Sequence, residues 1–123
     1  MANKKSEKTL AELESKAINF RDQRDWEQFH NPKNIAGSIV IEATELLEVF
    51  QWVEGKESKK LATKKLQEVK DEMSDVLVYL VTLAHDLNID LIQAAIEKIE
   101  KNDKKYPVEK AKGKSTKYTE FKK

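Results

Sequence analysis

Two pairs of acidic residues share the same spacing, Glu42 with Glu45 and Glu72 with Asp75. Each pair lies in an apolar run, IVIEATELLEVFQW or EVKDEMSDVLVYLVTLA. Residues three apart lie on one face of a helix, so both members of a pair point the same way. If the two helices face each other, four carboxylates converge and repel by about 4 kcal/mol per close pair at an effective dielectric of about 20. Such a cluster requires cations.

The types of these side chains limit which cation the cluster can bind. Neither acid pair is followed by a histidine at the third position, because His30 and His85 lie elsewhere. An all-oxygen set suits Mg²⁺ or Mn²⁺ better than iron or zinc. Mg²⁺ commonly binds together with phosphates, so the pattern indicates a phosphorylated substrate. The alternative is that the acids only border a buried stripe and pair with lysines.

Aromatic residues follow the same helical faces as the acids. Tyr79 lies four residues after Asp75 and Trp52 seven after Glu45, while Trp26 and His30 precede the first acid pair. Such side chains could stack on a flat base and bind its edge. The alternative is that they are ordinary core aromatics.

A further set of polar residues recurs on one face of a later helix. Its members are Lys98, Asn102, Lys105 and Tyr106. The amide could hydrogen-bond a base edge, and the lysines could neutralise phosphate oxygens.

The composition predicts one small all-α domain over residues 1–123. Hydrophobic residues make up 39% and charged residues 37% of the chain, with 3 Gly and 2 Pro. The absence of cysteine excludes disulfides, thiolate catalysis and Cys-based zinc sites. We expect a cytoplasmic protein that binds no membrane, because there is no signal-like segment or long apolar run. A net charge of +1 argues against coating a nucleic acid polymer.

The periodicity and capping residues predict a four-helix bundle. A helical core over about 6–106 would precede a basic C-terminal tail at about 107–123. The four helices would span about 6–25, 32–53, 61–87 and 91–105, with a charged connector at 56–60. Asn31 would cap the second helix and Gly55 would end it; Asp90 with Gln93 would start the fourth and Pro107 would stop it. The predicted core of the second and third helices includes Ile35, Ala43, Leu47, Leu66, Met73, Val76, Leu77 and Leu80.

Four strings together resemble a known family. In order they are RDWEQFHNPKN, IEATELLEVFQW, EMSDVLVYL and KNDKKYP, and the resemblance covers roughly Leu10 to Gly113. They are similar to the MazG-like all-α nucleoside triphosphate pyrophosphohydrolases, especially the small dCTP-pyrophosphatase-type branch. The resemblance implies Mg²⁺-dependent cleavage of a (d)NTP to (d)NMP and pyrophosphate, as nucleotide-pool housekeeping. It also implies a homodimer or homotetramer with sites formed across subunits.

The resemblance assigns roles to individual residues. Glu42, Glu45, Glu72 and Asp75 would bind Mg²⁺, for which Mn²⁺ could substitute. Glu45 and Glu42 would be catalytic, although spacing does not say which takes a proton, and Glu48 is a weaker candidate. Residues implied to line the nucleoside pocket are Trp26, His30, Trp52, Tyr79 and Asn102. Those implied to reach the phosphates or close the pocket are Lys98, Lys105 and Tyr106.

One position departs from the family pattern. Ala17 stands where the dCTP-preferring members tend to carry a histidine near the base, which leaves the base preference open. Two other classes of protein also stay open. One is a catalytically silent nucleotide-binding or regulatory module, and the other is a structural bundle whose acids form only surface salt bridges.

Overall fold

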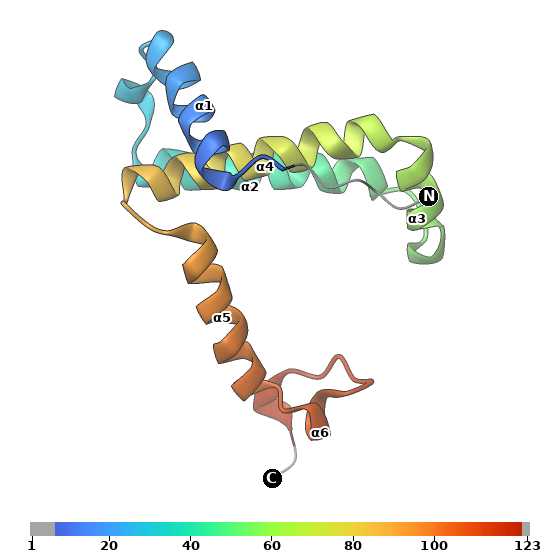
Figure 1. Ribbon diagram of the computed structural model, residues 1–123. Helices are drawn as coiled ribbons and strands as arrows, with labels where there is room; N and C mark the ends of the chain where they lie inside the picture. The colour runs from blue at the N-terminus through green and yellow to red at the C-terminus, as the bar shows by residue number, and fades with distance from the viewer. Residues whose placement is uncertain (1–6, 122–123) are drawn as a thin grey trace. The chain divides into compact units, whose positions relative to one another are not determined.

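The computed structural model describes residues 7–121, and this part of the chain is all-α without strands, as predicted (Figure 1). The helices form two compact units, the first ending at Asn88 and the second beginning at Ile89. The elements in chain order are α1 (Leu10–Gln23), the 3₁₀ turn η1 (Glu27–Phe29), α2 (Pro32–Phe50), α3 (Gly55–Lys64), α4 (Leu66–Asp86), α5 (Leu91–Lys105), α6 (Val108–Ala111) and the 3₁₀ turn η2 (Tyr118–Glu120).

In the first unit, α2 and α4 lie side by side along most of their length (Figure 1). Helix α1 packs on α4, and α3 contacts the ends of α2 and α4 away from α1. Among the described residues, the buried apolar side chains are Ile35 of α2 with Val81 and Ala84 of α4. The core of the unit is therefore small and lies toward the end where α1 packs.

The start of α2 is fixed by its capping residues, as the sequence predicts. Asn31 Oδ1 accepts the backbone N–H of Asn34 at 2.8 Å, and Pro32 occupies the first turn. The Asn34 side chain donates to the carbonyl of Phe29 at 3.1 Å. These bonds connect η1 to the helix that carries the first acid pair.

The expected number of helices is wrong, because residues 7–121 contain six α-helices rather than four. The predicted connector at 56–60 lies inside α3, and Gly55 begins that helix, whereas α2 already ends at Phe50. Lys, Glu, Ala and Leu are good helix formers, and the half-buried Leu61 and Ala62 anchor this segment. A break at Lys65 divides the predicted 61–87 helix between α3 and α4.

The first helix is shorter than predicted. Residue 6, its expected start, lies outside the described residues, and residues 7–9 are not helical. Thr9 caps α1 by accepting the N–H of Glu12 at 3.2 Å, and the helix ends at Gln23.

Part of the predicted core is exposed. Ile35 is buried as expected, but Leu47 is 64% exposed, and several other apolar positions of α2 and α4 are also exposed. A single two-helix layer can bury only one face of each helix, which explains the difference. The predicted core residues exposed in the single chain are Ala43, Leu47, Leu66, Met73, Leu77 and Leu80.

The second unit consists of α5 and the segment that follows it. Helix α5 has the predicted bounds, and Asp90 caps it by accepting the N–H of Gln93 at 3.0 Å. The expected basic tail contains α6 and η2. The ring of Tyr106 packs edge-on against Tyr118 and Phe121, with centroids 5.9 and 5.7 Å away, so this segment folds back onto the end of α5. Between residues 7 and 121, every helix is too short or too polar to cross a bilayer.

Candidate active site

Four carboxylates meet where α2 and α4 lie side by side. Helix α2 supplies Glu42 and Glu45, and α4 supplies Glu72 and Asp75. One carboxylate oxygen from each residue lies within 4.8 Å of those of the other three. The i, i+3 spacing puts both acids of each helix on the face turned toward the other helix. We call these four residues the acid cluster.

Burial and the neighbouring acids raise the pKa of two members of the cluster, Glu42 and Glu72. Burial, then the hydrogen bond and charge of Glu45, then the charges of Asp75 and Glu72 raise the pKa of Glu42 to about 7. The pKa of Glu72 is raised by burial first and then by Glu45, with smaller contributions from Asp75 and Asp71. In the absence of a cation, the cluster therefore retains a proton near neutral pH.

The donor set fits a hard divalent cation. Glu42 and Glu72 are half-buried, and the Oε2 atom of each is buried without a hydrogen-bond partner among residues 7–121. Such atoms are costly unless a ligand or ion satisfies them. Closely spaced carboxylate oxygens are the ligands that Mg²⁺ and Mn²⁺ prefer.

An aromatic pocket of about 160 Å³ adjoins this cluster. Its walls come from α1, from the loop that carries Trp26 and His30, and from α4. Asp75 lines the pocket and is also a member of the acid cluster, so the two features are continuous. The residues that line the aromatic pocket are Ala17, Phe20, Arg21, Trp26, His30, Asp75, Val78, Tyr79 and Thr82.

The pocket combines flat apolar surfaces with a few polar atoms. The rings of Phe20 and Trp26 meet edge to face with centroids 5.7 Å apart. His30 Nδ1 is buried and has no hydrogen-bond partner in the described part of the chain, whereas the hydroxyl of Thr82 donates to the carbonyl of Val78 at 2.8 Å. A planar ligand with polar groups on its edge matches this lining.

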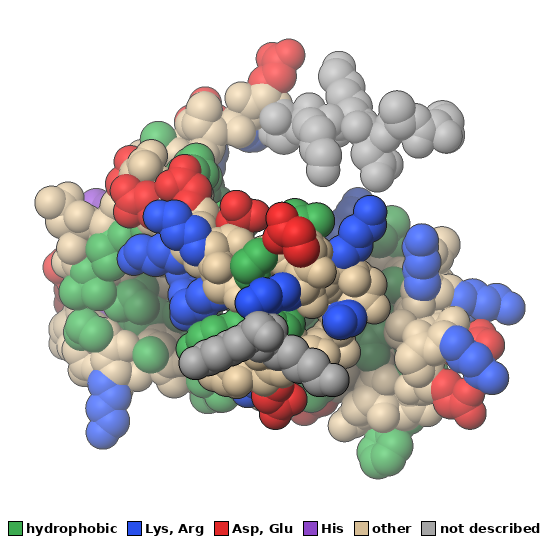
Figure 2. Space-filling model, turned by 90° about the horizontal axis from the view of Figure 1, so that it is seen from below, with side chains coloured by type: hydrophobic (Ala, Val, Ile, Leu, Met, Phe, Trp, Pro, Cys, Tyr) green, Lys and Arg blue, Asp and Glu red, His purple; other side chains and the backbone are tan. Residues whose placement is uncertain are grey.

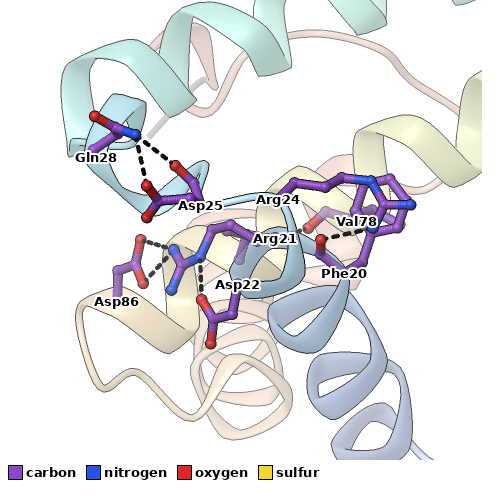
Figure 3. A network of polar contacts seen from close by, with 9 residues as sticks. Phe20, Arg21, Asp22, Arg24, Asp25, Gln28, Val78 and Asp86 are labelled. Carbon is purple, nitrogen blue, oxygen red and sulfur yellow. Dashed lines mark hydrogen bonds and ion pairs between the residues drawn. The ribbon is translucent and has the colours of Figure 1, made fainter.

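Beside the pocket, an ion pair between the buried Arg21 and the partly exposed side chain of Asp86 joins α1 to α4. Arg21 is 4% exposed, and its Nη1 lies 2.8 Å from both carboxylate oxygens of Asp86 (Figure 3). Burial opposes the charge of Arg21, but the hydrogen bond and charge of Asp86 outweigh it, so its pKa is raised. Arg21 therefore stays charged at every pH relevant to the protein.

The structure brings together some of the residues selected from the sequence. Trp26, His30 and Tyr79 line one pocket beside Asp75. Trp52 is 89% exposed and lies outside this pocket, and Glu48 is exposed and outside the acid cluster.

The remaining predicted residues lie in the second unit, and all are exposed: Lys98, Asn102, Lys105 and Tyr106. Asn102 accepts the backbone N–H of Tyr106 through its carbonyl at 2.8 Å. The ammonium of Lys105 lies 5.0 Å from the ring centroid of Tyr118. Within this unit, Lys105 and Tyr106 thus contact the segment that follows α5.

Four pocket residues were not selected from the sequence, namely Phe20, Arg21, Val78 and Thr82. Two of them carry a signal that could have identified them. Thr82 lies seven residues after Asp75 on the face of Tyr79, and Arg21 lies four after Ala17. An extension of each helical face by one turn would have included both.

Known proteins resemble this chain over most of its length. The model of the MazG-like family matches residues 38–121. A mouse protein named dCTP pyrophosphatase 1 is 41% identical over 117 residues, which cover 94% of this chain and 69% of the mouse protein. The human protein of the same name is 39% identical over 117 residues, with the same two coverages.

A solved structure supports the same relationship. It is the crystal structure of a pyrophosphatase from Archaeoglobus fulgidus, and it is 40% identical in sequence. It superimposes with a TM-score of 0.78 over 86% of this chain and 99% of its own. Because the family model matches more than half of the chain and the relatives are about 40% identical, the chain belongs to the MazG-like family.

Proposed function

We propose that this protein is a Mg²⁺-dependent nucleoside triphosphate pyrophosphohydrolase that cleaves a (d)NTP to a (d)NMP and pyrophosphate. The single observation that carries the proposal is the double role of Asp75, which belongs to the acid cluster and also lines the aromatic pocket. A ligand with a planar group in the pocket would hold its anionic end beside the acids. The names of the relatives, dCTP pyrophosphatase and pyrophosphatase, support this enzyme class.

The two parts of the site would bind the two ends of the substrate. Trp26 and Tyr79 would supply the flat surfaces for the base, and the Nδ1 atom of His30, which no described residue hydrogen-bonds, would face its polar edge. Glu42, Glu45, Glu72 and Asp75 would hold Mg²⁺, or Mn²⁺ as a substitute. When bound, the cation offsets the repulsion between the carboxylates and the phosphates and polarises the phosphate oxygens.

The reaction is an addition of water across the anhydride between the α and β phosphates. The bond between the bridging oxygen and the α-phosphorus breaks, and the water oxygen bonds to the α-phosphorus. The monophosphate and pyrophosphate then separate. The water gives up a proton, and we propose the carboxylates of Glu45 and Glu42 as the bases that accept it. Glu42 is suited to this role because burial and its acidic neighbours raise its pKa to about 7, so it can gain and lose a proton near neutral pH.

The choice of base depends on the pocket. Ala17 lines the pocket with a methyl group and offers no hydrogen bond to a base. Recognition of the base edge therefore falls to the polar groups that remain, among them His30 and Thr82. We propose a deoxynucleoside triphosphate as the substrate class, with a role in clearing unwanted nucleotides.

Self-association would cover the apolar surface that the single chain leaves open. Monomeric proteins seldom expose large contiguous apolar areas, and hydrophobic side chains reach the surface in Figure 2. We propose a homodimer or homotetramer, in which Trp52 and the lysines of a second copy could complete the site. The large apolar side chains of α2, α4 and the turn after α2 that are exposed are Val40, Ile41, Leu47, Trp52, Leu66, Met73, Leu77 and Leu80.

The test is pyrophosphate release from a panel of canonical and modified nucleoside triphosphates, with Mg²⁺ or with EDTA. Glu45→Gln and Asp75→Asn should each lower the rate by at least 100-fold, a typical order for the loss of a catalytic group. Asp71→Asn is the matched control, because Asp71 is an acid of α4 outside the cluster that accepts a bond from Gln67. Full activity in both cluster variants would refute the assignment of the acids.

The same panel separates the enzyme from a silent module. Nucleotide binding that requires Mg²⁺ but yields no pyrophosphate from any triphosphate would favour a regulatory binding protein. If neither the stability of the protein nor its affinity for nucleotides depends on Mg²⁺, a structural bundle would be favoured.

A further inference from the structure

The ion pair between the buried Arg21 and the partly exposed Asp86 has no place in the binding or cleavage steps described above. Arg21 is the only fully buried charged side chain among the described residues, and Asp86 is the last residue of α4 (Figure 3). A buried ion pair is a weak source of stability, because an apolar pair can hold two helices as well without the loss of solvation. Unlike an apolar contact, an ion pair with hydrogen bonds fixes the distance and the relative orientation of the two side chains that form it.

The backbone of Arg21 also holds the turn that carries Trp26. The carbonyl of Arg21 accepts the N–H groups of both Arg24 and Trp26, at 3.2 and 3.1 Å. Between them, Asp25 adopts a left-handed conformation with φ of 54°, which turns the chain sharply after α1. The position of Trp26 therefore depends on the position of Arg21.

Two side chains close to Arg21 in the sequence, those of Phe20 and Arg24, also support the position of Trp26. The ring of Phe20 supports Trp26 edge-on at 5.7 Å, and the guanidinium of Arg24 stacks on the Phe20 ring at 3.7 Å. Phe20, Arg21 and Trp26 all line the aromatic pocket from the side of α1, whereas Asp75, Tyr79 and Thr82 line it from α4. The ion pair joins Arg21 of the first wall to Asp86, which lies on α4 about one helical turn beyond Thr82.

We infer that Arg21 and Asp86 are positioning residues, which set the distance between the Trp26 wall and the α4 wall of the aromatic pocket and thereby the affinity for the planar end of the ligand. The consequence for catalysis rests on the proposed function. Loss of the pair should weaken nucleotide binding and leave the acid cluster, which lies between α2 and α4, unaffected.

A second contact between the same helices provides the matched control. His85 Nδ1 lies 2.8 Å from Glu14 Oε1, so this pair also joins α4 to α1, one residue away from Asp86. It borders a different groove, which shares no lining residue with the aromatic pocket. Glu14→Gln should lower stability without any effect on the pocket.

The experiment compares Asp86→Asn, Asp86→Glu, Arg21→Lys and Glu14→Gln with the wild type. For Asp86→Asn and Arg21→Lys we expect KM for the nucleotide to rise about tenfold, with kcat within about twofold and an unchanged Mg²⁺ midpoint. Asp86→Glu keeps the charge and should recover part of the affinity. Glu14→Gln should leave KM unchanged even where its melting temperature falls as far as that of Asp86→Asn.

A readout without turnover separates this inference from the proposed function. In a Trp52→Phe background, Trp26 is the only tryptophan, and Asp86→Asn should increase its quenching by acrylamide. If the wild type releases no pyrophosphate, the proposed function fails while this measurement still decides the positioning role. Unchanged quenching in folded Asp86→Asn, or an unchanged KM with only a lower melting temperature, would overturn the inference. If Asp86→Asn does not fold, the same two readouts on Arg21→Lys decide.

Discussion

Replacement of Glu42 by glutamine should make the metal-free protein more stable at pH 8. Burial and the neighbouring carboxylates raise the pKa of Glu42 from 4.5 to about 7, so the folded state binds its proton more tightly than the unfolded state does. The free energy of unfolding of the wild type therefore falls as the pH rises from about 4.5 through 7, and it levels off above that range. Glutamine cannot ionise, so this loss of stability is absent from Glu42→Gln.

The size of the effect follows from the same shift. A rise from 4.5 to about 7 corresponds to about 3 kcal/mol at most. Glu42 is only half-buried, and screening by water reduces the expected difference to about 1–2 kcal/mol. For a domain of this length, that is a melting temperature higher by about 3–8 °C at pH 8, and no difference is expected near pH 4.5.

The assay is thermal unfolding in EDTA from pH 4.5 to 8, repeated with Mg²⁺. In the wild type at pH 8, Mg²⁺ at 100 times its dissociation constant should stabilise the protein by about 2.7 kcal/mol, and in Glu42→Gln by much less. Glu48→Gln is the control, because Glu48 is an exposed acid of α2 outside the cluster. A wild-type stability that is flat across this range in EDTA, or a Glu42→Gln protein that is less stable at pH 8, would refute the reasoning.

Three further predictions concern the cation, the pocket and the fold. The affinity of the wild type for Mg²⁺, measured by calorimetry, should rise between pH 6 and 8 as the proton held by Glu42 is lost, and an affinity independent of pH would contradict the raised pKa of Glu42. Trp26→Ala should raise KM for the nucleotide about 5- to 100-fold, the range for loss of one stacking partner, whereas Trp26→Phe should keep most of the affinity. An unchanged KM for Trp26→Ala would mean that the ring only packs against Phe20. Asn31→Ala removes the cap of α2 and should cost about 1 kcal/mol in the free energy of unfolding, measured by denaturant titration, while Asn31→Asp should cost little; equal losses in both would show that the cap bond to Asn34 is not the cause.

The sequence predicts well those features that depend on residues close together in the chain. The caps at Asn31 and Asp90 are local hydrogen bonds, and both form as predicted. The spacing of Glu42 with Glu45 and of Glu72 with Asp75 requires only that each segment be helical and that α2 and α4 be neighbours.

The features that were missed depend on packing between distant segments. The charged residues at 56–60 predict a connector, whereas they form the first part of α3, which has a half-buried side at Leu61 and Ala62. The ion pair of Arg21 with Asp86 joins residues 65 positions apart, and no local pattern relates them. Likewise, apolar periodicity predicts that Leu47 and Met73 pack against other apolar side chains, but it does not say whether those side chains belong to the same chain.

The most direct test of the central claim is whether the acid cluster and the aromatic pocket bind one ligand. Calorimetry should give the dissociation constant of a non-hydrolysable nucleoside triphosphate with Mg²⁺ and with EDTA, for the wild type and for Asp75→Asn. We predict that Mg²⁺ tightens nucleotide binding at least about tenfold in the wild type and that this coupling disappears in Asp75→Asn. Equal affinity of the wild type with and without Mg²⁺ would contradict a single site that spans both features.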